Sequence, residues 1–369
     1  MIHYIICVGV AVAIGWFYNQ ELLLLLKLYP FYKKLFAKYM FPKMKYKVPI
    51  TSVYDYSLPP FPNTWYPIGL SSEFKNGKIY DKKIAGQNII VYRSNNNNTI
   101  CVQSRYCPHM GVDLAYGIIN NNCIICPFHH HCIHPQKPNQ AIQEKNKRIY
   151  HVEEVHGIVF LWISTESETP TISIQCLFDT FFPDYIQYFY RTFFLERHVG
   201  GHIVDYAEHL LDVSHAPYTH GVELLPVNNM LVKHEHSFQV QFKIKGYSFT
   251  PKFTYMTPTF GFVDYGHNMR TFIMFIIHDI GDIQMVQLPY IDSSYKKTFQ
   301  SFLGALYTHF DFSEEAAFFS TKKHRNRSLT RSETPMNEFR SWFEKTYYTD
   351  HEKENFLLKQ KKHDEKLDW

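Results

Sequence analysis

Residues 107–132 read CPHMGVDLAYGIINNNCIICPFHHHC and place four cysteines and four histidines within 26 residues. Two pairs stand out by spacing: Cys107-x-His109, sixteen intervening residues, and then Cys126-x-x-His129. Thiolate and neutral imidazole are both good ligands of iron and of zinc. Two such pairs on separate loops favour a binuclear iron–sulfur centre in which cysteines hold one iron and histidines the other. A zinc site is the alternative, although zinc fingers pair Cys with Cys and His with His.

The remaining cysteines are not expected to form a disulfide framework. The chain has seven cysteines, an odd number, and five of them lie between residues 101 and 132. This clustering is unlike the spacing in small secreted domains, and it favours metal binding in a reducing compartment. Cys101, Cys123 and Cys132 are therefore interpreted as small buried residues.

The ligand spacing resembles the motif of the Rieske family, which is Cys-x-His, about sixteen residues, then Cys-x-x-His. The flanking segments RYCPHMG (105–111) and HVEEVHGIVFLWI (151–163) are also similar to the strands and loops of a Rieske domain. The family usually has Gly-Trp after the second histidine, where this chain has His130 and His131. Glycine relieves backbone strain at such a turn. The resemblance implies a [2Fe-2S] cluster bound by Cys107, His109, Cys126 and His129.

A second metal site is indicated by EHLLDVSHAPYTH, residues 208–220. We expect a helix up to about Ala216, in which Glu208, Asp212 and His215 would share one face. On an ideal helix His220 would point away from these three residues. The proline at residue 217 is expected to break the helix and let the chain bring His220 back toward them. Two histidines and a distant carboxylate form the facial triad of non-haem iron(II). Polar residues on a solvated helix face are the alternative.

This second segment resembles the Rieske oxygenases, whose motif is Asp-x-x-His-x₄-His. The resemblance implies iron ligands at His215 and His220, and a homotrimer in which Asp212 bridges to a cluster histidine of the neighbouring subunit. The third ligand is implied at Glu315, ahead of a segment that matches the family through its Pro-x₃-Phe-Arg-x-Trp ending. Glu314 and Asp311 are the alternatives for this ligand.

The amino terminus favours a membrane anchor. Residues 1–17, MIHYIICVGVAVAIGWF, carry no formal charge, and seven lysines follow between residues 27 and 47. The apolar run is at the lower edge of the length of a bilayer span. It lacks the charged n-region and the small-residue cleavage site of a signal peptide. The lysines place the rest of the chain on the cytosolic face, and we expect the endoplasmic reticulum membrane. A buried amphipathic hairpin is the alternative.

The whole pattern predicts an α+β protein with two folded domains. With 369 residues, of which 45% are hydrophobic, the chain can bury a core, and its balance of 38 basic to 34 acidic residues does not indicate a nucleic-acid partner. We predict a transmembrane anchor (1–26), a basic juxtamembrane segment with a proline-rich linker (27–62) and an all-β Rieske domain (63–168). A catalytic domain (169–350) follows, with an antiparallel sheet flanked by helices that carry mononuclear iron. A charged tail (351–369) ends the chain.

The phrase GHIVDYAEHLLDVSH, residues 201–215, resembles the membrane-anchored eukaryotic Rieske oxygenases that act as cholesterol 7-desaturases. This resemblance implies an oxidoreductase that uses dioxygen, and electrons that a reductase takes from NAD(P)H. The implied substrate is a membrane-soluble sterol, with C7(8)-desaturation of cholesterol as the leading interpretation. Two alternatives stay open. One is a hydroxylase or O-demethylase acting on an aromatic, tetrapyrrole or steroid substrate, and the other is a non-catalytic electron carrier.

Overall fold

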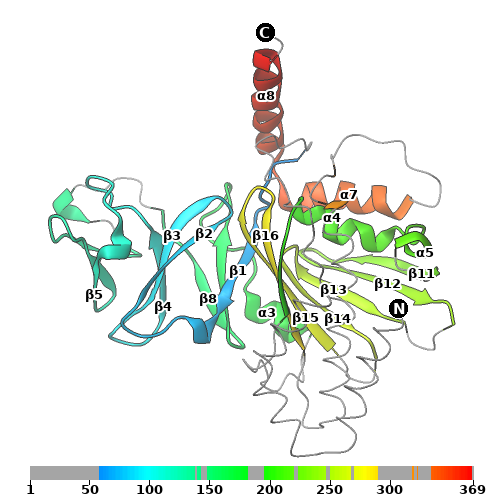
Figure 1. Cartoon of the computed structure of the whole chain (residues 1–369), viewed down its shortest axis with the longest axis horizontal. Helices are drawn as coiled ribbons and strands as arrows, with labels where there is room; N and C mark the ends of the chain where they lie inside the picture. Colours follow the sequence, from blue (N-terminus) through cyan, green and yellow to red (C-terminus); the bar gives the residue numbers. More distant parts are fainter. Residues whose placement is uncertain are drawn as a thin grey trace, which may run out of the picture. The chain divides into compact units, whose positions relative to one another are not determined.

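The computed structural model describes residues 58–137, 139–142, 148–181, 195–219, 223–246, 250–266, 270–289, 318–319, 322 and 334–367. The predicted anchor (1–26), the lysine-rich segment and most of the linker lie outside these residues. Across the described ranges, no helix combines the length and the apolar character needed to cross a bilayer. The described chain is built from antiparallel sheets with helices added after residue 173 (Figure 1).

The first part of the described chain forms three small antiparallel sheets. The strands of the first are β1 (Thr64–Leu70), β9 (Ile158–Ile163) and β8 (Val152–Val155). The second contains β2 (Ile79–Ile84), β3 (Gln87–Arg93) and β4 (Ile100–Ser104), and the third β5 (Ile118–Asn120), β6 (Cys123–Ile125) and β7 (Cys132–Ile133). The β-branched and aromatic runs predicted as strands therefore do form strands.

Short turns separate these strands where the sequence is rich in asparagine. Asn98 and Asn121 have φ of 59° and 52°, in the left-handed region that asparagine enters more readily than most residues. The first and second sheets are joined by the buried Arg93, which donates to Phe74 O at 2.8 Å and pairs with Glu154 at 3.1 Å. The asparagine runs thus form turns, and the sheets they connect form one packed unit.

The second part of the chain is dominated by a seven-stranded antiparallel sheet (Figure 1). In spatial order its strands are β10 (Leu195–Val199), β16 (Asp282–Pro289), β15 (Arg270–Asp279), β14 (Phe260–Asp264), β13 (Lys252–Thr257), β12 (Phe238–Ile244) and β11 (Leu224–Lys233). The inner strand β15 is buried without interruption from Thr271 to Ile277. Such a continuous apolar run is expected of a strand that is covered on both faces.

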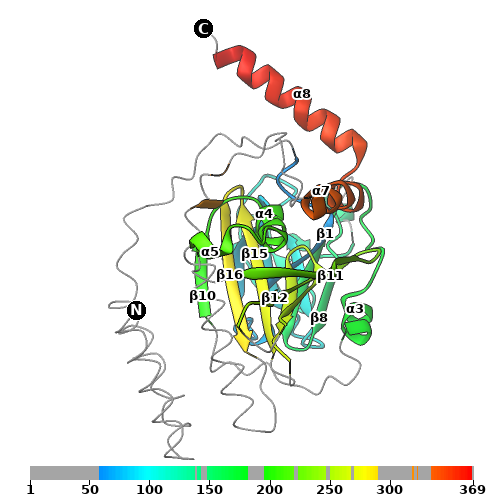
Figure 2. The same ribbon diagram turned by 90° about the vertical axis from the view of Figure 1, so that its right-hand side faces the viewer.

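One face of this sheet is covered by α4 (Ile203–Glu208) and α7 (Thr334–Tyr347), which lie side by side (Figure 2). The hydroxyl of Tyr255 in β13 donates to the carbonyl of Tyr206 at 3.2 Å. Phe238 in β12 stacks on Tyr255, and its ring centroid lies 4.9 Å from that of Phe339 in α7. The predicted antiparallel sheet flanked by helices is thereby confirmed.

The opposite face is covered by α3 (Ile174–Phe181) and by β9 of the first small sheet. The ring centroid of Phe260 lies 5.7 Å from that of Phe178 in α3 and 5.1 Å from that of Phe160 in β9. Hydrogen bonds reinforce this packing, because Thr259 Oγ1 donates to Trp65 O at 2.6 Å. The small sheets therefore pack directly on the large one.

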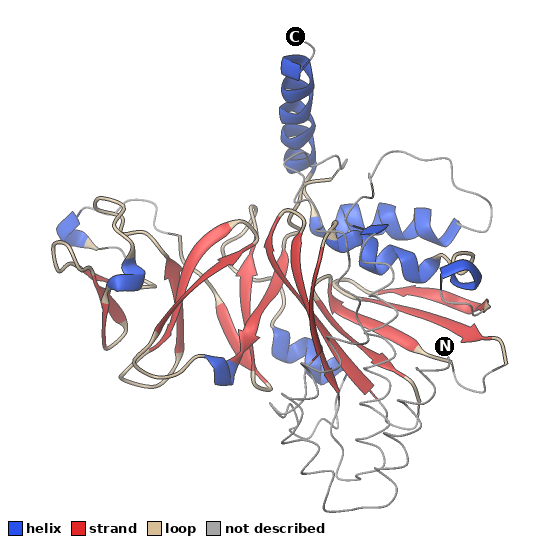
Figure 3. Cartoon of the chain, in the orientation of Figure 1, coloured by secondary structure: helices blue, strands red, loops and turns tan. Residues whose placement is uncertain are grey.

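The described chain ends in α8 (Asp350–Leu367), a charged helix (Figure 3). Up to Lys359 its residues alternate between half-buried and exposed, with no buried face. The sequence HEKENFLLKQKKHDEKLDW has no sustained apolar periodicity that could pack on a sheet. The predicted charged tail is therefore a helix without a buried face over this range.

Candidate functional site

Two tight loops carry the first predicted metal site. In the first loop the backbone N–H of Cys107 donates to Val112 O and that of Gly111 donates to Cys107 O, each at 2.8 Å. In the second, the N–H of Cys126 donates to His131 O at 2.9 Å and that of His130 donates to Cys126 O at 3.0 Å. Both loops therefore turn back on their own cysteine, and this fixes where each thiol lies.

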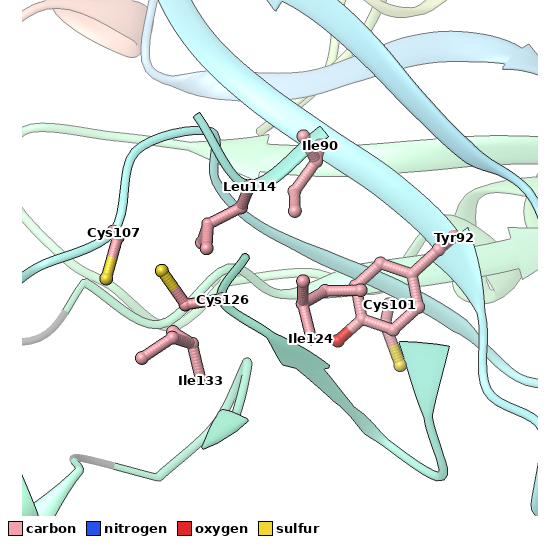
Figure 4. Packing of buried hydrophobic residues seen from close by; sticks show 8 residues of the cluster. All are labelled: Ile90, Tyr92, Cys101, Cys107, Leu114, Ile124, Cys126 and Ile133. Atoms are coloured by element: carbon pink, nitrogen blue, oxygen red, sulfur yellow. The ribbon is translucent and has the colours of Figure 1, made fainter. Parts of the chain in front are cut away.

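The two thiols meet in an apolar environment. Cys107 is 3% exposed and Cys126 is 1% exposed, and their sulfurs lie close together, with Leu114 on one side and Ile133 on the other (Figure 4). Burial raises the pKa of the Cys107 thiol, while the backbone N–H groups of His109 and Met110 act in the opposite direction. A metal centre that accepts both thiolates would displace their protons and supply the counter-charge that this buried pair needs.

The two predicted imidazole ligands also lie together. The ring centroids of His109 and His129 are 4.7 Å apart. Since a metal–imidazole bond is about 2.1 Å long, one ion can reach both rings at this separation. Two adjacent thiols and two adjacent imidazoles, each pair split between the two loops, form the donor set of a binuclear cluster with mixed ligation. The four predicted residues are thus brought together and fit a [2Fe-2S] group.

A further histidine lies in this cluster and was not singled out by the spacing argument. The ring centroid of His131 is 5.1 Å from that of His109 and 6.1 Å from that of His129. His130, between them, has φ of 56°, in the left-handed region. The turn that glycine would make is therefore made by histidine, which tolerates this region better than most residues. The run of three histidines was the signal in the sequence.

Cys123 is buried, as predicted, but the prediction that Cys123 and Cys132 are not part of a disulfide is wrong. The two form a disulfide with Cα atoms 5.6 Å apart, and Cys132 is exposed. β6 and β7 are paired with Ile125 opposite Cys132, and this register brings the two sulfurs together. The bond closes the hairpin that carries Cys126 and His129. Cys101 is a buried free thiol, as predicted.

The predicted helix through the second site is shorter than expected. α4 ends at Glu208, a single 3-10 turn (η4, His209–Leu211) follows, and α5 (Ala216–Thr219) begins after a turn. The helix breaks at Asp212, because its Oδ1 accepts hydrogen bonds from Ser214 N at 3.0 Å and Ser214 Oγ at 2.5 Å. Such side-chain acceptors compete with helix continuation. Pro217 lies in the first turn of α5, where a missing N–H costs little, so it is not the breaking residue.

His215 is oriented by the residue predicted to act with it. Its Nδ1 hydrogen-bonds the carbonyl oxygen of Asp212 and lies 3.8 Å from Asp212 Oδ2. A carbonyl oxygen can only accept, so Nδ1 carries the proton and Nε2 is the nitrogen that carries the in-plane lone pair. This is the arrangement that metal-binding histidines require. Both side chains are half-buried.

Glu208 does not share a face with the predicted ligands but is buried in an ion-pair network. Its Oε2 accepts from Arg340 Nε at 2.8 Å. Asp205, on the same helix, lies 2.7 Å from Lys322 Nζ through its Oδ1. Both carboxylates are fully buried. The network fixes α4 to residues far along the chain, so Glu208 has a structural partner rather than an open metal position.

The other predicted ligands, His220 and Glu315, and the alternatives Glu314 and Asp311, lie outside the described residues. Over the described ranges, no three His, Cys, Asp or Glu side chains converge as a group that could bind one ion. Phe319, four residues after Glu315, is described, and its ring centroid is 5.2 Å from that of His209. His209 precedes the motif and was missed in the sequence, where no spacing distinguished it.

A family model of the Rieske [2Fe-2S] domain matches residues 64–149 of the chain. Curated relatives include a cholesterol 7-desaturase from Bombyx mori, 31% identical over 175 residues, which are 45% of this chain and 37% of the relative. The cholesterol 7-desaturase from Xenopus laevis is 28% identical over 207 residues, 50% of this chain and 43% of the relative. The oxygenase component of a 3-ketosteroid-9-alpha-monooxygenase from Rhodococcus rhodochrous is 25% identical over 169 residues, 43% and 44% of the two chains. The chain thus spans less than half the length of these relatives.

Solved structures with a similar fold include dicamba monooxygenase bound to 3,6-dichlorosalicylic acid. Its TM-score is 0.53 at 16% identity, and the match covers 78% of this chain and 98% of that chain. The oxygenase of carbazole 1,9a-dioxygenase, in reduced complex with ferredoxin, has a TM-score of 0.51 at 17% identity, covering 75% and 87%. At such identities the likeness concerns the fold alone.

Proposed function

We propose that the chain, whose residues 64–149 match the Rieske [2Fe-2S] domain, is a Rieske oxygenase and the terminal oxygenase of a sterol-oxidising system. We infer that it introduces the C7(8) double bond into cholesterol or a related sterol. The observation that carries this proposal is the similarity to cholesterol 7-desaturases, such as that of Bombyx mori at 31% identity. The donor sets at the two sites are the chemical support for it.

Each site has a distinct task in this proposal. Cys107, His109, Cys126 and His129 would hold the [2Fe-2S] cluster, and His215, His220 and Glu315 the mononuclear iron. When bound, the cluster supplies single electrons and the iron supplies dioxygen chemistry. The chain itself orients the ligands: the buried thiols and the tight loops set the first site, and the Asp212 carbonyl sets the tautomer of His215.

The balance of the reaction defines the partners. Desaturation removes two hydrogens from the sterol, and one dioxygen becomes two waters by taking these hydrogens with two further electrons and two protons. The electrons would come from NAD(P)H through a separate reductase. The support is that the matched 3-ketosteroid-9-alpha-monooxygenase relative is named as an oxygenase component. Dioxygen, a hydrophobic sterol and a reductase are therefore the proposed partners.

We propose that Asp212 connects two copies of the chain in a homotrimer. Asp212 and His215 are half-buried, and Tyr218, three residues after His215, is 92% exposed. Around the first site Tyr106, Met110 and Phe128 are exposed as well. Apolar groups exposed beside both metal sites support docking of one site against the other in a second copy. Sedimentation of the purified chain at a trimer mass checks this, and a monomer at micromolar concentration would contradict it.

We also propose that the amino-terminal segment anchors the protein in the endoplasmic reticulum membrane, with the catalytic part in the cytosol. The support is the uncharged run of residues 1–17 followed by seven lysines. A membrane location would bring the site to a lipid-soluble substrate. Release of the full-length chain from microsomes by alkaline carbonate would contradict the anchor.

The activity is tested by expressing the full chain in cells that make no 5,7-diene sterols. Membranes supplied with cholesterol, NADPH, a reductase and dioxygen should form a conjugated 5,7-diene, detected by its ultraviolet absorbance and by mass. Cys107→Ser should abolish the product, since it removes a cluster ligand, while Cys101→Ser should leave it unchanged. A fully metallated protein that converts no sterol would overturn the proposal.

A steroid hydroxylase is the second candidate, favoured by the similarity to the Rhodococcus rhodochrous 3-ketosteroid-9-alpha-monooxygenase component. Its product would be heavier than the substrate by one oxygen, whereas a desaturated product is lighter by two hydrogens. The same incubation with a 3-ketosteroid therefore separates the two by mass. A non-catalytic carrier would hold two irons per chain instead of three.

A further inference from the structure

The disulfide between Cys123 and Cys132 closes the hairpin that carries two of the cluster ligands. The loop from Cys126 to His131 connects β6 to β7, and the backbone N–H of Cys126 donates to His131 O at 2.9 Å. His131 directly precedes Cys132 in the chain. The covalent bond therefore lies next to a hydrogen bond that positions the Cys126 thiol.

The two strands that the disulfide joins are held unequally. β6 is the middle strand of its sheet, between β5 and β7, whereas β7 is an edge strand of 2 residues. β7 is paired with β6 through Ile133 opposite Ile124 and Cys132 opposite Ile125. Outside this ladder, Asn139 Nδ2 donates to Cys132 O at 2.8 Å. Since so short a pairing is marginal in water, β7 is the strand that separates when the disulfide is open.

The two sulfurs also differ in their access to solvent. Cys123 is 3% exposed, whereas Cys132 is an exposed residue. The chain just before Cys123 is anchored to the core, because the hydroxyl of Tyr92 donates to Asn122 O at 2.9 Å. In thiol–disulfide exchange a thiolate attacks one of the two sulfurs, and access helps to select which one. An external thiol should therefore attack Cys132 and displace Cys123.

Two small thiols balance the reaction. The thiolate of the first forms a bond to the Cys132 sulfur while the Cys123–Cys132 bond breaks. Cys123 leaves with the electron pair of that bond and takes up the proton of the attacking thiol. A second thiol attacks the mixed disulfide on Cys132, which is released as a thiol together with a small-molecule disulfide. The two small thiols are thereby oxidised, and the protein disulfide is reduced by two electrons.

We propose that Cys132 is a site of reversible modification by small thiols of the glutathione class, and that opening its disulfide loosens the loop that holds Cys126 and His129. The cluster is the one that the Rieske [2Fe-2S] domain match implies, so the inference does not depend on the sterol. The cytosolic location proposed above would supply the thiols. When β7 separates, the Cys126 N–H loses its acceptor on His131. The thiol state of the hairpin then sets how firmly the chain holds its cluster.

The test uses the full chain in detergent, purified without reductant, with Cys176→Ser as the parent. Cys176 is the exposed free cysteine among the described residues, so its removal takes away a competing thiol. The parent is incubated with glutathione, quenched with acid and alkylated, and fragment-ion mass spectrometry locates the glutathione adduct. The loss of the cluster to an iron chelator is followed by the visible absorbance of the protein.

Two further variants separate the roles of the two sulfurs. Cys123→Ser leaves a free thiol at the exposed Cys132, and Cys132→Ser leaves one at the buried Cys123. With glutathione disulfide the first variant should form the mixed disulfide and the second should not, although both lack the native bond. The double variant has no disulfide to open, and it therefore controls for a direct action of glutathione on the cluster.

We expect glutathione to modify Cys132 and not Cys123 in the parent. The chelator should remove the cluster about tenfold faster or more once the disulfide is open, because the closure between residues nine positions apart is lost. The double variant should lose its cluster at this faster rate with and without glutathione. An intact disulfide after glutathione treatment, an adduct on Cys123, or an unchanged rate of cluster loss after opening would each overturn the inference.

Discussion

Asp212 has two roles that one side-chain change can separate. Its Oδ1 closes the turn with Ser214, and its charge lies 3.8 Å from His215 Nδ1 through Oδ2. Asparagine retains the Oδ1 acceptor but loses the charge, whereas alanine loses both. We expect Asp212→Asn to fold like the wild type and to lose most of its turnover, because the proposed route of electrons between copies passes through the carboxylate.

Asp212→Ala should lose turnover in the same way and in addition be less stable by about 1 kcal/mol, since the hydrogen bonds of the turn are removed. Urea unfolding measures the stability of both variants, and cluster reoxidation with substrate and dioxygen measures the transfer. An asparagine variant that reoxidises at the wild-type rate would show that the carboxylate charge has no part in the transfer.

Short elements hold the cluster ligands, and η2 (Leu114–Tyr116) is fixed by one aspartate. Asp113 caps η2 by accepting a hydrogen bond from Ala115 N at 2.9 Å. It also accepts one from the guanidinium of Arg105 at 2.7 Å. The hydrogen bond from the Arg105 guanidinium lowers the pKa of the Asp113 carboxyl. A carboxyl whose pKa is lowered in the folded state stabilises the protein above its ordinary pKa of about 4. This stabilisation is lost as the pH falls through the lowered pKa.

Asp113→Asn keeps the cap but removes the charge. We therefore expect it to be less stable than the wild type near neutral pH, and to match it at the acidic end where Asp113 is protonated. Unfolding midpoints measured from about pH 7 down to about pH 3 check this sign. A difference that stays constant over the whole pH range would contradict it.

The β6–β7 hairpin is closed by the disulfide between Cys123 and Cys132, nine residues apart. Closing a loop of this length stabilises the folded state by about 2–3 kcal/mol on the chain-entropy account. We expect Cys132→Ser to assemble the cluster, because Cys132 is not a ligand, but to lose the Rieske signal at lower temperature. A reductant should have the same effect on the wild type and none on the variant. Equal thermal loss with and without reductant in the wild type would contradict this.

At the scale of the whole molecule, residues 132 positions apart are joined by the Glu208–Arg340 ion pair. Glu208 is fully buried, and Lys322 lies 3.6 Å from it as well. Arg340→Met leaves this carboxylate with only the more distant lysine, so we expect a loss of roughly 3 kcal/mol, as when one partner of a buried pair is removed.

The double variant Glu208→Gln with Arg340→Met should recover much of that loss, because no buried charge is then left without its arginine. Urea unfolding of both single variants and the double variant gives the coupling energy. Strictly additive effects would contradict the pairing of α4 with α7.

The sequence by itself predicted the donor set that the structure brings together at the first site, and it determined most of the strands. Each loop carries one cysteine and one histidine a few residues apart, so spacing alone predicts Cys107, His109, Cys126 and His129 as the donor set. Strands such as β3 and β15 are equally local, because β-branched and aromatic runs bury themselves wherever they pair. These predictions needed no knowledge of distant contacts.

The tertiary structure decided what depends on residues that are far apart in the chain or on competing local bonds. The disulfide of Cys132 follows from the register of β6 and β7, and the burial of Glu208 follows from Arg340. The early end of α4 comes from the competition of the Asp212 side chain with the helix, and the place of His209 from its packing on Phe319. Periodicity along a sequence carries no information on such pairings, because their energy comes from groups that only folding brings within contact distance.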